Sequence, residues 1–95
     1  MKRPAVYILA SHRNGTLYTG VTGNLTKRIW QHKENLFEGF TKKYHVHQLV
    51  YFESHENFQS AFAREREIKT WKRLWKTKLI EQVNPTWEDL YDTLF

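Results

Sequence analysis

The chain has 95 residues, a formal net charge of +5 and no cysteine. A single domain is expected at this length, and the lack of cysteine excludes a disulfide framework, a thiolate metal site and a cysteine nucleophile, which suits a reducing cytoplasm. The apolar run Ala5–Ala10 has six residues, too few to cross a bilayer, so we expect no membrane partner.

The charge is unevenly distributed along the chain. Residues 84–95 carry Glu88, Asp89 and Asp92 without any Lys or Arg, so this tail has a charge of −3. All 15 basic residues therefore lie in 1–83 beside seven Glu, which gives that body +8 (15 − 7). We predict a basic domain over 1–83 that favours nucleic acid, with an acidic tail over 84–95 packed on it. The alternative is a solvated basic surface without a specific partner.

The first two predicted elements form a β-hairpin. Residues 5–10 and 17–22 are apolar and β-prone, and Asn14-Gly15 between them is a strong turn signal. A two-residue turn there pairs Tyr7 with Thr22 and Tyr18 with Ser11. Both tyrosines then project from one face of the sheet, offset by about four residues, or roughly 13 Å.

Helices and a third strand follow. Asn24 is suited to cap a helix, and Thr86 with Asp89 resembles a capping box before a final helical pattern. The intervening patterns predict a helix over about 25–36, a strand over 47–53 and a long helix over about 57–76, with an extension to residue 82 as the alternative. The expected fold is a small single-domain α/β sandwich, β-β-α-β-α-α, with a three-stranded, mostly antiparallel sheet flanked by helices.

Glu65 is the most informative single residue. A wheel of the long helix places it at the centre of an apolar stripe formed by Phe58, Ala61, Phe62, Ile68, Trp75 and Leu79. A carboxylate facing a core costs several kcal/mol unless it is paired or binds a metal. The alternative is an ion pair with Lys69, four residues further along the helix.

Arg28 and His32 are also four residues apart, on one side of the preceding helix. A guanidinium can hold a phosphate with two hydrogen bonds, and an imidazole can donate to it or relay a proton. Tyr7 and Tyr18 are suited to strands, and a glycine such as Gly20 inside a strand leaves room for a close approach. The alternative for these residues is a purely structural role.

Together these positions resemble the GIY-YIG nuclease superfamily, in particular its small stand-alone bacterial proteins, which are related to the UvrC N-terminal domain. Ala5-Val6-Tyr7 and Tyr18-Thr19-Gly20 stand where the family has Gly-Ile-Tyr and Tyr-Ile-Gly. Residues 25–28 followed by His32 resemble its arginine helix, and residues 61–65 resemble the helix with its metal-binding glutamate. The resemblance extends over about residues 4–85.

The resemblance implies a metal-dependent endonuclease that hydrolyses DNA phosphodiester bonds, in DNA repair or recombination. One Mg²⁺ or Mn²⁺ on Glu65 would bind the scissile phosphate, and Tyr7, assisted by His32, would deprotonate the attacking water. Arg28 would stabilise the transition state, and Tyr18 would orient phosphate or water. The residues expected to contact nucleic acid are Gly20, Lys27, Lys42, Lys43, Arg64, Lys69 and Lys72.

Two positions depart from the family pattern. Val21 stands where some relatives carry Lys, and Asn84 is the only candidate for a late active-site Asn, although it lies nineteen residues after Glu65 (84 − 65). Trp71 and Trp75 are expected in the core, and His45 with His47 lacks a third ligand for zinc. The alternatives to a nuclease are a catalytically weak or inactive module that binds DNA or RNA, and a structural role in a larger assembly. The oligomeric state stays open, with a monomer as one possibility.

Overall fold

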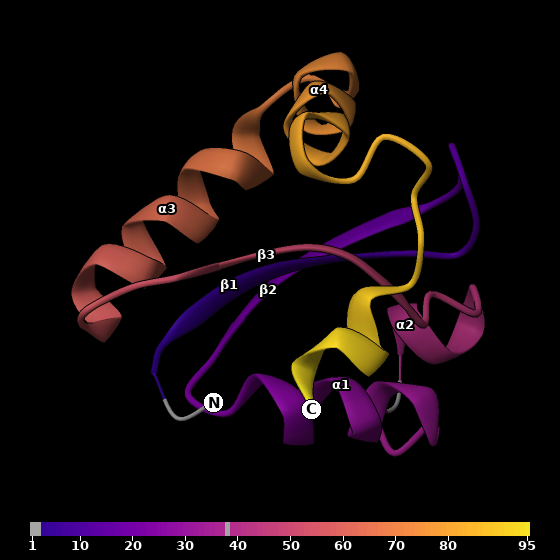
Figure 1. Ribbon diagram of the computed structural model, residues 1–95, viewed down its shortest axis with the longest axis horizontal. Helices are drawn as coiled ribbons and strands as arrows, with labels where there is room; N and C mark the ends of the chain where they lie inside the picture. Colours follow the sequence, from indigo (N-terminus) through magenta and orange to yellow (C-terminus); the bar gives the residue numbers. More distant parts are fainter. Residues whose placement is uncertain (1–2, 38) are drawn as a thin grey trace.

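The computed structural model describes residues 3–37 and 39–95, and a three-stranded antiparallel sheet forms its centre (Figure 1). Its strands are β1 (Ala5–Ala10), β2 (Leu17–Thr22) and β3 (Gln48–Ser54), in the order β2-β1-β3. Every residue of β1 is fully buried, because this strand is paired on both edges and covered on both faces. The predicted fold class is confirmed.

The hairpin register differs from the prediction. Tyr7 pairs with Gly20, and Tyr18 pairs with Leu9. The two-residue turn was wrong: the backbone N–H of Ser11 donates to Thr16 O at 3.0 Å, which closes a four-residue loop in which Asn14 takes a φ of 60°. A register shift of two residues leaves each side chain on its predicted face. The observed register also makes Tyr7 and Tyr18 diagonal neighbours on adjacent strands, with ring centroids 6.4 Å apart.

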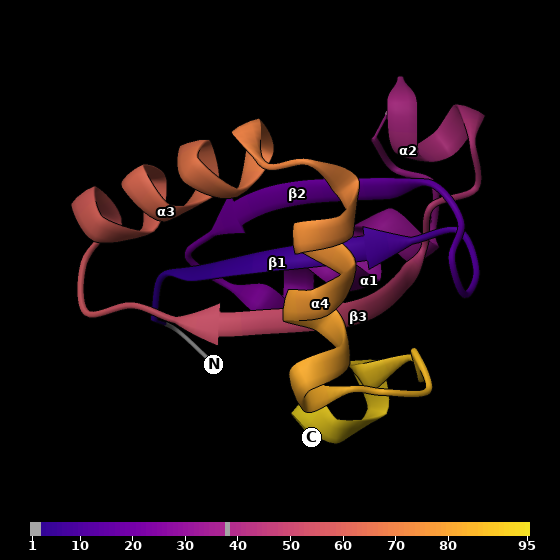
Figure 2. The ribbon, with the colours of Figure 1, turned by 90° about the horizontal axis from the view of Figure 1, so that it is seen from above.

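Helices cover both faces of the sheet (Figure 1). Helices α3 (Phe58–Thr70) and α4 (Arg73–Val83) lie on one face, while α1 (Leu25–Lys33), α2 (Phe40–Lys43) and the 3₁₀ helix η1 (Leu90–Leu94) lie on the other. Figure 2 shows α3 beside β2 and α4 crossing β1 and β3. Even-numbered residues of β1 face α3 and α4, and odd-numbered residues face α1, so Tyr7 belongs to the α1 side.

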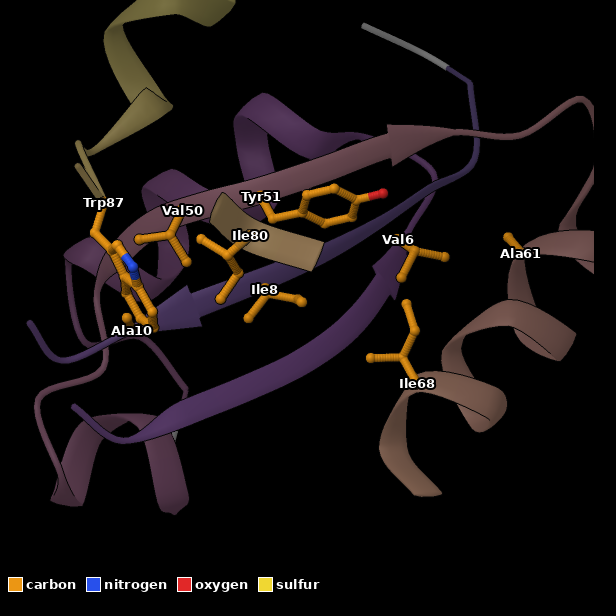
Figure 3. Close-up of a cluster of buried hydrophobic side chains, with 9 residues drawn as sticks. All are labelled: Val6, Ile8, Ala10, Val50, Tyr51, Ala61, Ile68, Ile80 and Trp87. Atoms are coloured by element: carbon orange, nitrogen blue, oxygen red, sulfur yellow. The ribbon is translucent and has the colours of Figure 1, made fainter. Parts of the chain in front are cut away.

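The core on the α3 and α4 side consists of β1 side chains packed against both helices. Figure 3 shows Val6 beside Ile68 of α3, Ile8 beside Ile80 of α4, and Ala10 beside Trp87. Burying three β1 side chains here and three on the opposite face fixes which side of the sheet each residue occupies, because neighbouring strand residues point in opposite directions.

The predicted long helix is two helices. The chain leaves α3 at Trp71 and enters α4 after Lys72, with extended ψ angles of 149° and 152° at these two residues. The predicted stripe was therefore wrong as one continuous core face, because the helix breaks after Thr70 and several of its apolar residues are exposed. Trp75 is 62% exposed, and Phe62, on α3, is 47% exposed. Trp71 is half-buried and packs at the edge of the core. Trp75 was expected in the core, and that prediction was wrong.

Other element boundaries also shift. α1 is capped by Asn24 as predicted, since its side chain accepts from Lys27 N at 3.2 Å, but it ends at Lys33 rather than at residue 36. The four-residue helix α2 was not predicted, and β3 begins and ends one residue later than expected. In the described ranges, no helix is long and apolar enough to span a membrane.

The C-terminal residues pack on both faces of the sheet, with Trp87 in the core on the α3 and α4 side and Leu90 against the core on the α1 side. The predicted capping box of Thr86 with Asp89 was wrong, because Asp89 caps η1 alone, by accepting from Tyr91 N at 3.1 Å. The other interactions of Asp89 are a hydrogen bond from Leu49 N at 3.1 Å and an ion pair with Lys33. The acidic tail thus contacts the basic body, while the domain division at residues 83 and 84 stays a prediction.

Candidate active site

Tyr7 and Gly20 form the floor of the candidate site. The Tyr7 ring is fully buried and lies across β2 at Gly20. A Cβ atom at position 20 would lie 2.5 Å from both Cζ and the hydroxyl oxygen of Tyr7. Any residue larger than glycine at position 20 would collide with the Tyr7 ring. Gly20 is therefore needed for Tyr7 to occupy its position in the site.

His32 holds the Tyr7 hydroxyl from the last turn of α1. Its Nε2 lies 3.1 Å from the Tyr7 hydroxyl, and its Nδ1 lies 3.2 Å from Thr41 Oγ1. Burial, then the charges of Arg28 and His47, lowers the pKa of His32 to about 4. The imidazole is therefore neutral at physiological pH, with one ring nitrogen able to donate and the other able to accept.

Thr41 was not identified from the sequence. It is a buried residue of α2, a helix of four residues that the sequence pattern did not predict. The signal that could have identified it is weak, since a single threonine between Phe40 and Lys42 carries no periodicity. Its role in orienting His32 depends on a contact between segments nine residues apart.

The pKa of Tyr7 is raised above its ordinary value. Burial is the largest cause, and the nearby Tyr18 acts in the same direction. The charge of Arg28 and a hydrogen bond from it lower this pKa, and the carboxylate of Glu65 raises it. Burial outweighs the opposing effect of Arg28, so the phenol stays protonated at neutral pH, and Arg28, Tyr18 and Glu65 are close enough to Tyr7 to act on its charge.

A pocket of about 230 Å³ opens beside this group. Arg28 forms one wall, with its Cζ 5.1 Å from the centroid of the Phe37 ring. Tyr18 forms another, stacked on Phe40 with centroids 6.3 Å apart. The full lining is Tyr18, Arg28, His32, Phe37, Phe40 and Thr41. Polar groups converge in a partly aromatic hollow, an arrangement typical of a binding site.

Glu65 lies in a neighbouring hollow on α3, together with Phe62 and Arg66. Its side chain is 16% exposed and accepts from Lys69 Nζ at 3.2 Å, so the ion pair considered as the alternative is present. Among residues 3–37 and 39–95, no group of three His, Cys, Asp or Glu side chains could hold a metal.

The residues predicted to contact nucleic acid lie in separate parts of the surface. Lys27 is exposed beside Arg28, in a hollow that also includes Thr22, Asn24 and Gln31. Lys42 and Lys43 lie on α2, next to the pocket-lining Thr41. Lys72 lies at the α3–α4 junction in a groove with Trp71 and Trp75. Arg64 is held by Glu53 and Glu67 at distances of 3.2 and 2.6 Å, which commits its guanidinium to intramolecular contacts.

Asn84 lies apart from this group of residues. Its buried side chain donates to Val50 O at 3.0 Å and to Glu88 O at 2.8 Å, and it accepts from Glu88 N at 3.0 Å. These bonds tie the end of α4 to β3 and to the tail. The structure therefore brings Tyr7, Tyr18, Arg28 and His32 together with Glu65 nearby, and it places Asn84 in a structural network.

Comparisons with known proteins show which family the chain belongs to. Residues 3–78 match the GIY-YIG catalytic domain. A UPF0213 protein of Staphylococcus saprophyticus is 38% identical over 82 residues, covering 86% of this chain and 99% of the relative. A UPF0213 protein of Clostridium perfringens is 43% identical over 75 residues, covering 79% and 80% of the two chains. The solution NMR structure of a UPF0213 protein from Bacillus halodurans aligns over 92% of both chains, with a TM-score of 0.57 and 26% identity. The chain belongs to the GIY-YIG family of nucleases.

Proposed function

We propose that this protein is a metal-dependent endonuclease that hydrolyses DNA phosphodiester bonds at the pocket beside Tyr7. The observation that carries the proposal is the 3.1 Å contact between the Tyr7 hydroxyl and His32, inside a group that includes Arg28, Tyr18 and Glu65. A proton acceptor can activate the attacking water, a cation can stabilise the charge that develops on the phosphate, and a carboxylate can hold a metal ion.

Tyr7 and His32 form a proton relay in this proposal. The attacking water gives a proton to the Tyr7 hydroxyl oxygen while the Tyr7 proton passes to Nε2 of His32. This concerted transfer suits a phenol whose raised pKa keeps it protonated, because no free phenolate is needed beforehand. Thr41, bound to Nδ1, holds the imidazole in the orientation that the relay needs.

Arg28 and Tyr18 bind the phosphate. Arg28 is half-buried and is oriented by Phe37, so its guanidinium can offer two parallel hydrogen bonds to non-bridging phosphate oxygens. Its charge stabilises the additional negative charge of the transition state. The Tyr18 hydroxyl belongs to the same pocket and orients phosphate or water.

Glu65 is the residue proposed to hold one Mg²⁺ or Mn²⁺. The residues fit such an ion, since Mg²⁺ is commonly bound through one or two carboxylates together with substrate phosphates and water. The hollow around Glu65 leaves room for these ligands, and Lys69 holds one of its oxygens by a single ion pair. When bound, the ion supplies Lewis-acid polarisation of the phosphate and neutralises the leaving oxygen.

DNA is proposed as the substrate because the pocket is bordered by Lys27, Lys42 and Lys43 on a chain of net charge +5. A role in DNA repair or recombination rests on the family alone, and the reducing cytoplasm rests on the absence of cysteine. The second candidate is a nucleic-acid-binding module without efficient cleavage. The Glu65–Lys69 ion pair favours it, because that pair competes with a metal ion.

The test is cleavage of labelled duplex, single-stranded, flap and four-way-junction DNA with Mg²⁺ or Mn²⁺. Glu65→Gln is the test variant, and Glu67→Gln is the matched control because Glu67 is an exposed carboxylate two positions along the same helix. We expect metal-dependent cutting by the wild type and the control, with loss in Glu65→Gln. Salt-dependent binding of DNA or RNA by all three proteins without cutting would establish the binding module instead.

A further inference from the structure

A groove separate from the Tyr7 pocket lies where α3 ends and α4 begins. It has a volume of about 410 Å³ and is lined by Trp71, Lys72 and Trp75. Figures 1 and 2 show this junction as the point where the chain turns from the side of the sheet to cross it. The extended backbone at Trp71 and Lys72 separates the two helices and leaves both indole rings at the surface.

The two indoles are presented differently. Trp71 is half-buried at the edge of the core, and the Arg64 guanidinium lies 5.1 Å from its ring centroid. Glu53 and Glu67 hold that guanidinium, so Trp71 forms a fixed wall. Trp75 is 62% exposed, with its ring centroid 6.4 Å from that of Trp71 at an interplanar angle of 56°. A large indole surface is therefore open to a planar ligand.

The charge around the groove selects an anionic partner. Residues 69–78 contain Lys69, Lys72, Arg73, Lys76 and Lys78 without any Asp or Glu. Lys69 is paired with Glu65, and Arg73 donates to the backbone oxygen of Gly15 at 2.5 Å. In the described part of the chain, no carboxylate pairs with Lys72, Arg73, Lys76 or Lys78. A second copy of this chain would bring the same positive charge to this face, which disfavours self-association there.

We propose that this groove is a binding site for single-stranded DNA, in which a base stacks on Trp75 and the adjoining phosphates contact Lys72 and Lys76. Aromatic side chains beside a basic surface are the combination that binds unpaired strands, because every base offers a π-face and every linkage a negative charge. Paired bases within a duplex are not free to stack on protein. The indoles and the cations thus specify an unpaired strand.

The proposal deepens the proposed function and rests on it for the choice of DNA. Trp71 lies six positions after Glu65 (71 − 65). At about 1.5 Å per helical residue, this separation is about 9 Å along α3, a distance that a few nucleotides can span. The groove would therefore hold an unpaired segment a few nucleotides from the bond that is cut, which favours substrates with a single-stranded flank.

The test is binding of fluorescently labelled dT12, U12 and a twelve-base-pair duplex, measured by anisotropy in EDTA. Under these conditions nothing is cut, so the result is independent of catalysis. Trp75→Ala is the test variant, and Leu74→Ala is the matched control because Leu74 is an exposed apolar neighbour on α4 outside the groove lining. Both residues are exposed, so both variants are expected to fold. Lys72→Gln tests the phosphate contact.

We expect Trp75→Ala to bind dT12 roughly 5- to 150-fold more weakly than the wild type, the loss typical of one stacked base. Leu74→Ala is expected to bind as the wild type does. Lys72→Gln is expected to lower the slope of log K against log salt by about 0.7, the value for one phosphate contact on a single strand. Unchanged binding by Trp75→Ala, or equal losses for dT12 and duplex, would overturn the proposal. Tighter binding of U12 than dT12 would overturn the choice of DNA.

Discussion

The hydroxyl oxygen of Tyr7 lies 3.1 Å from Nε2 of His32, and this contact joins the central strand β1 to the last turn of α1. Both residues are buried, and Gly20 leaves the space that the Tyr7 ring occupies. The pair therefore depends on the register of the hairpin as well as on α1. A change at any of these three positions is expected to affect the candidate site before it affects the rest of the fold.

Gly20→Ala tests this dependence. The new methyl group would lie 2.5 Å from a tyrosine ring that is buried and cannot move freely, so we expect a loss of about 1–3 kcal/mol in the free energy of unfolding, the usual cost of overpacking. Gly23→Ala is the matched control, because its methyl group would meet only the end of the exposed Phe58 ring, at 2.9 Å. Urea unfolding measures both. Equal stability of the two variants would contradict the close packing of Tyr7 on Gly20.

The pH dependence of stability tests the environment of His32. Its pKa is about 4 in the folded protein, against an ordinary value of 6.5. Between these values the unfolded chain binds more protons, so the contribution of His32 is complete above about pH 6.5 and is lost as the pH falls towards 4. The difference of the two pKa values corresponds to at most about 3 kcal/mol.

His32→Gln is the variant that isolates this contribution, and His12→Gln, at an exposed loop position, is its control. Urea unfolding at pH 7, 6, 5 and 4.5 is expected to show a steeper loss in the wild type and in His12→Gln than in His32→Gln. Parallel curves for all three proteins would show that His32 titrates normally.

Much of the fold could be predicted from the sequence because its signals are local. Alternating apolar residues place Tyr7 and Tyr18 on one face with a two-residue or a four-residue loop, since a register shift of two residues preserves facing. The length of the loop itself depends on Ser11 and Thr16, which close it by hydrogen bonds without a distinctive sequence signal. The distance between the two tyrosines was therefore overestimated.

Features that depend on long-range contacts could not be predicted. The break at Trp71 and Lys72 contains neither Pro nor Gly, so no local signal marks it, and α4 beyond it packs Ile80 into the core over the sheet. Thr41 joins the site only through a contact with His32. The spacing of Asn84 from Glu65 departs from the family pattern, and its hydrogen bond to Val50 of β3 could not be foreseen because it joins segments 34 residues apart.

Asn84→Ala is expected to lower stability without removing catalysis. The substitution leaves the buried carbonyl of Val50 and the backbone of Glu88 without their partners, at a cost of about 1–3 kcal/mol. Gln82→Ala, at an exposed position of α4, is the control. Thermal unfolding and single-turnover cleavage by the remaining folded protein measure the two effects separately. A large loss of cleavage at full stability would place Asn84 in the catalytic machinery.

The acidic tail is expected to stabilise the body through Asp89. Asp89→Ala removes the ion pair with Lys33 and the bonds from Leu49 N and Tyr91 N, so a loss of about 1–2 kcal/mol in the free energy of unfolding is expected. Asp92→Ala, at an exposed position of the same tail, is the control. Comparing DNA affinities of the two variants also tests whether the tail screens the basic surface. Tighter DNA binding by both variants would indicate screening by charge rather than docking through Asp89.

The most direct test of the account is single-turnover cleavage by Tyr7→Phe and Tyr51→Phe. Both substitutions remove one hydroxyl from a buried tyrosine of the sheet. Tyr51→Phe is the control, because the Tyr51 side chain belongs to the core on the opposite face from Tyr7 and its hydroxyl donates to Glu53 at 2.5 Å. The account predicts that Tyr7→Phe cuts about 10²- to 10⁴-fold more slowly, the usual worth of a general base, while Tyr51→Phe keeps the wild-type rate. Cleavage by Tyr7→Phe at the wild-type rate would contradict the account.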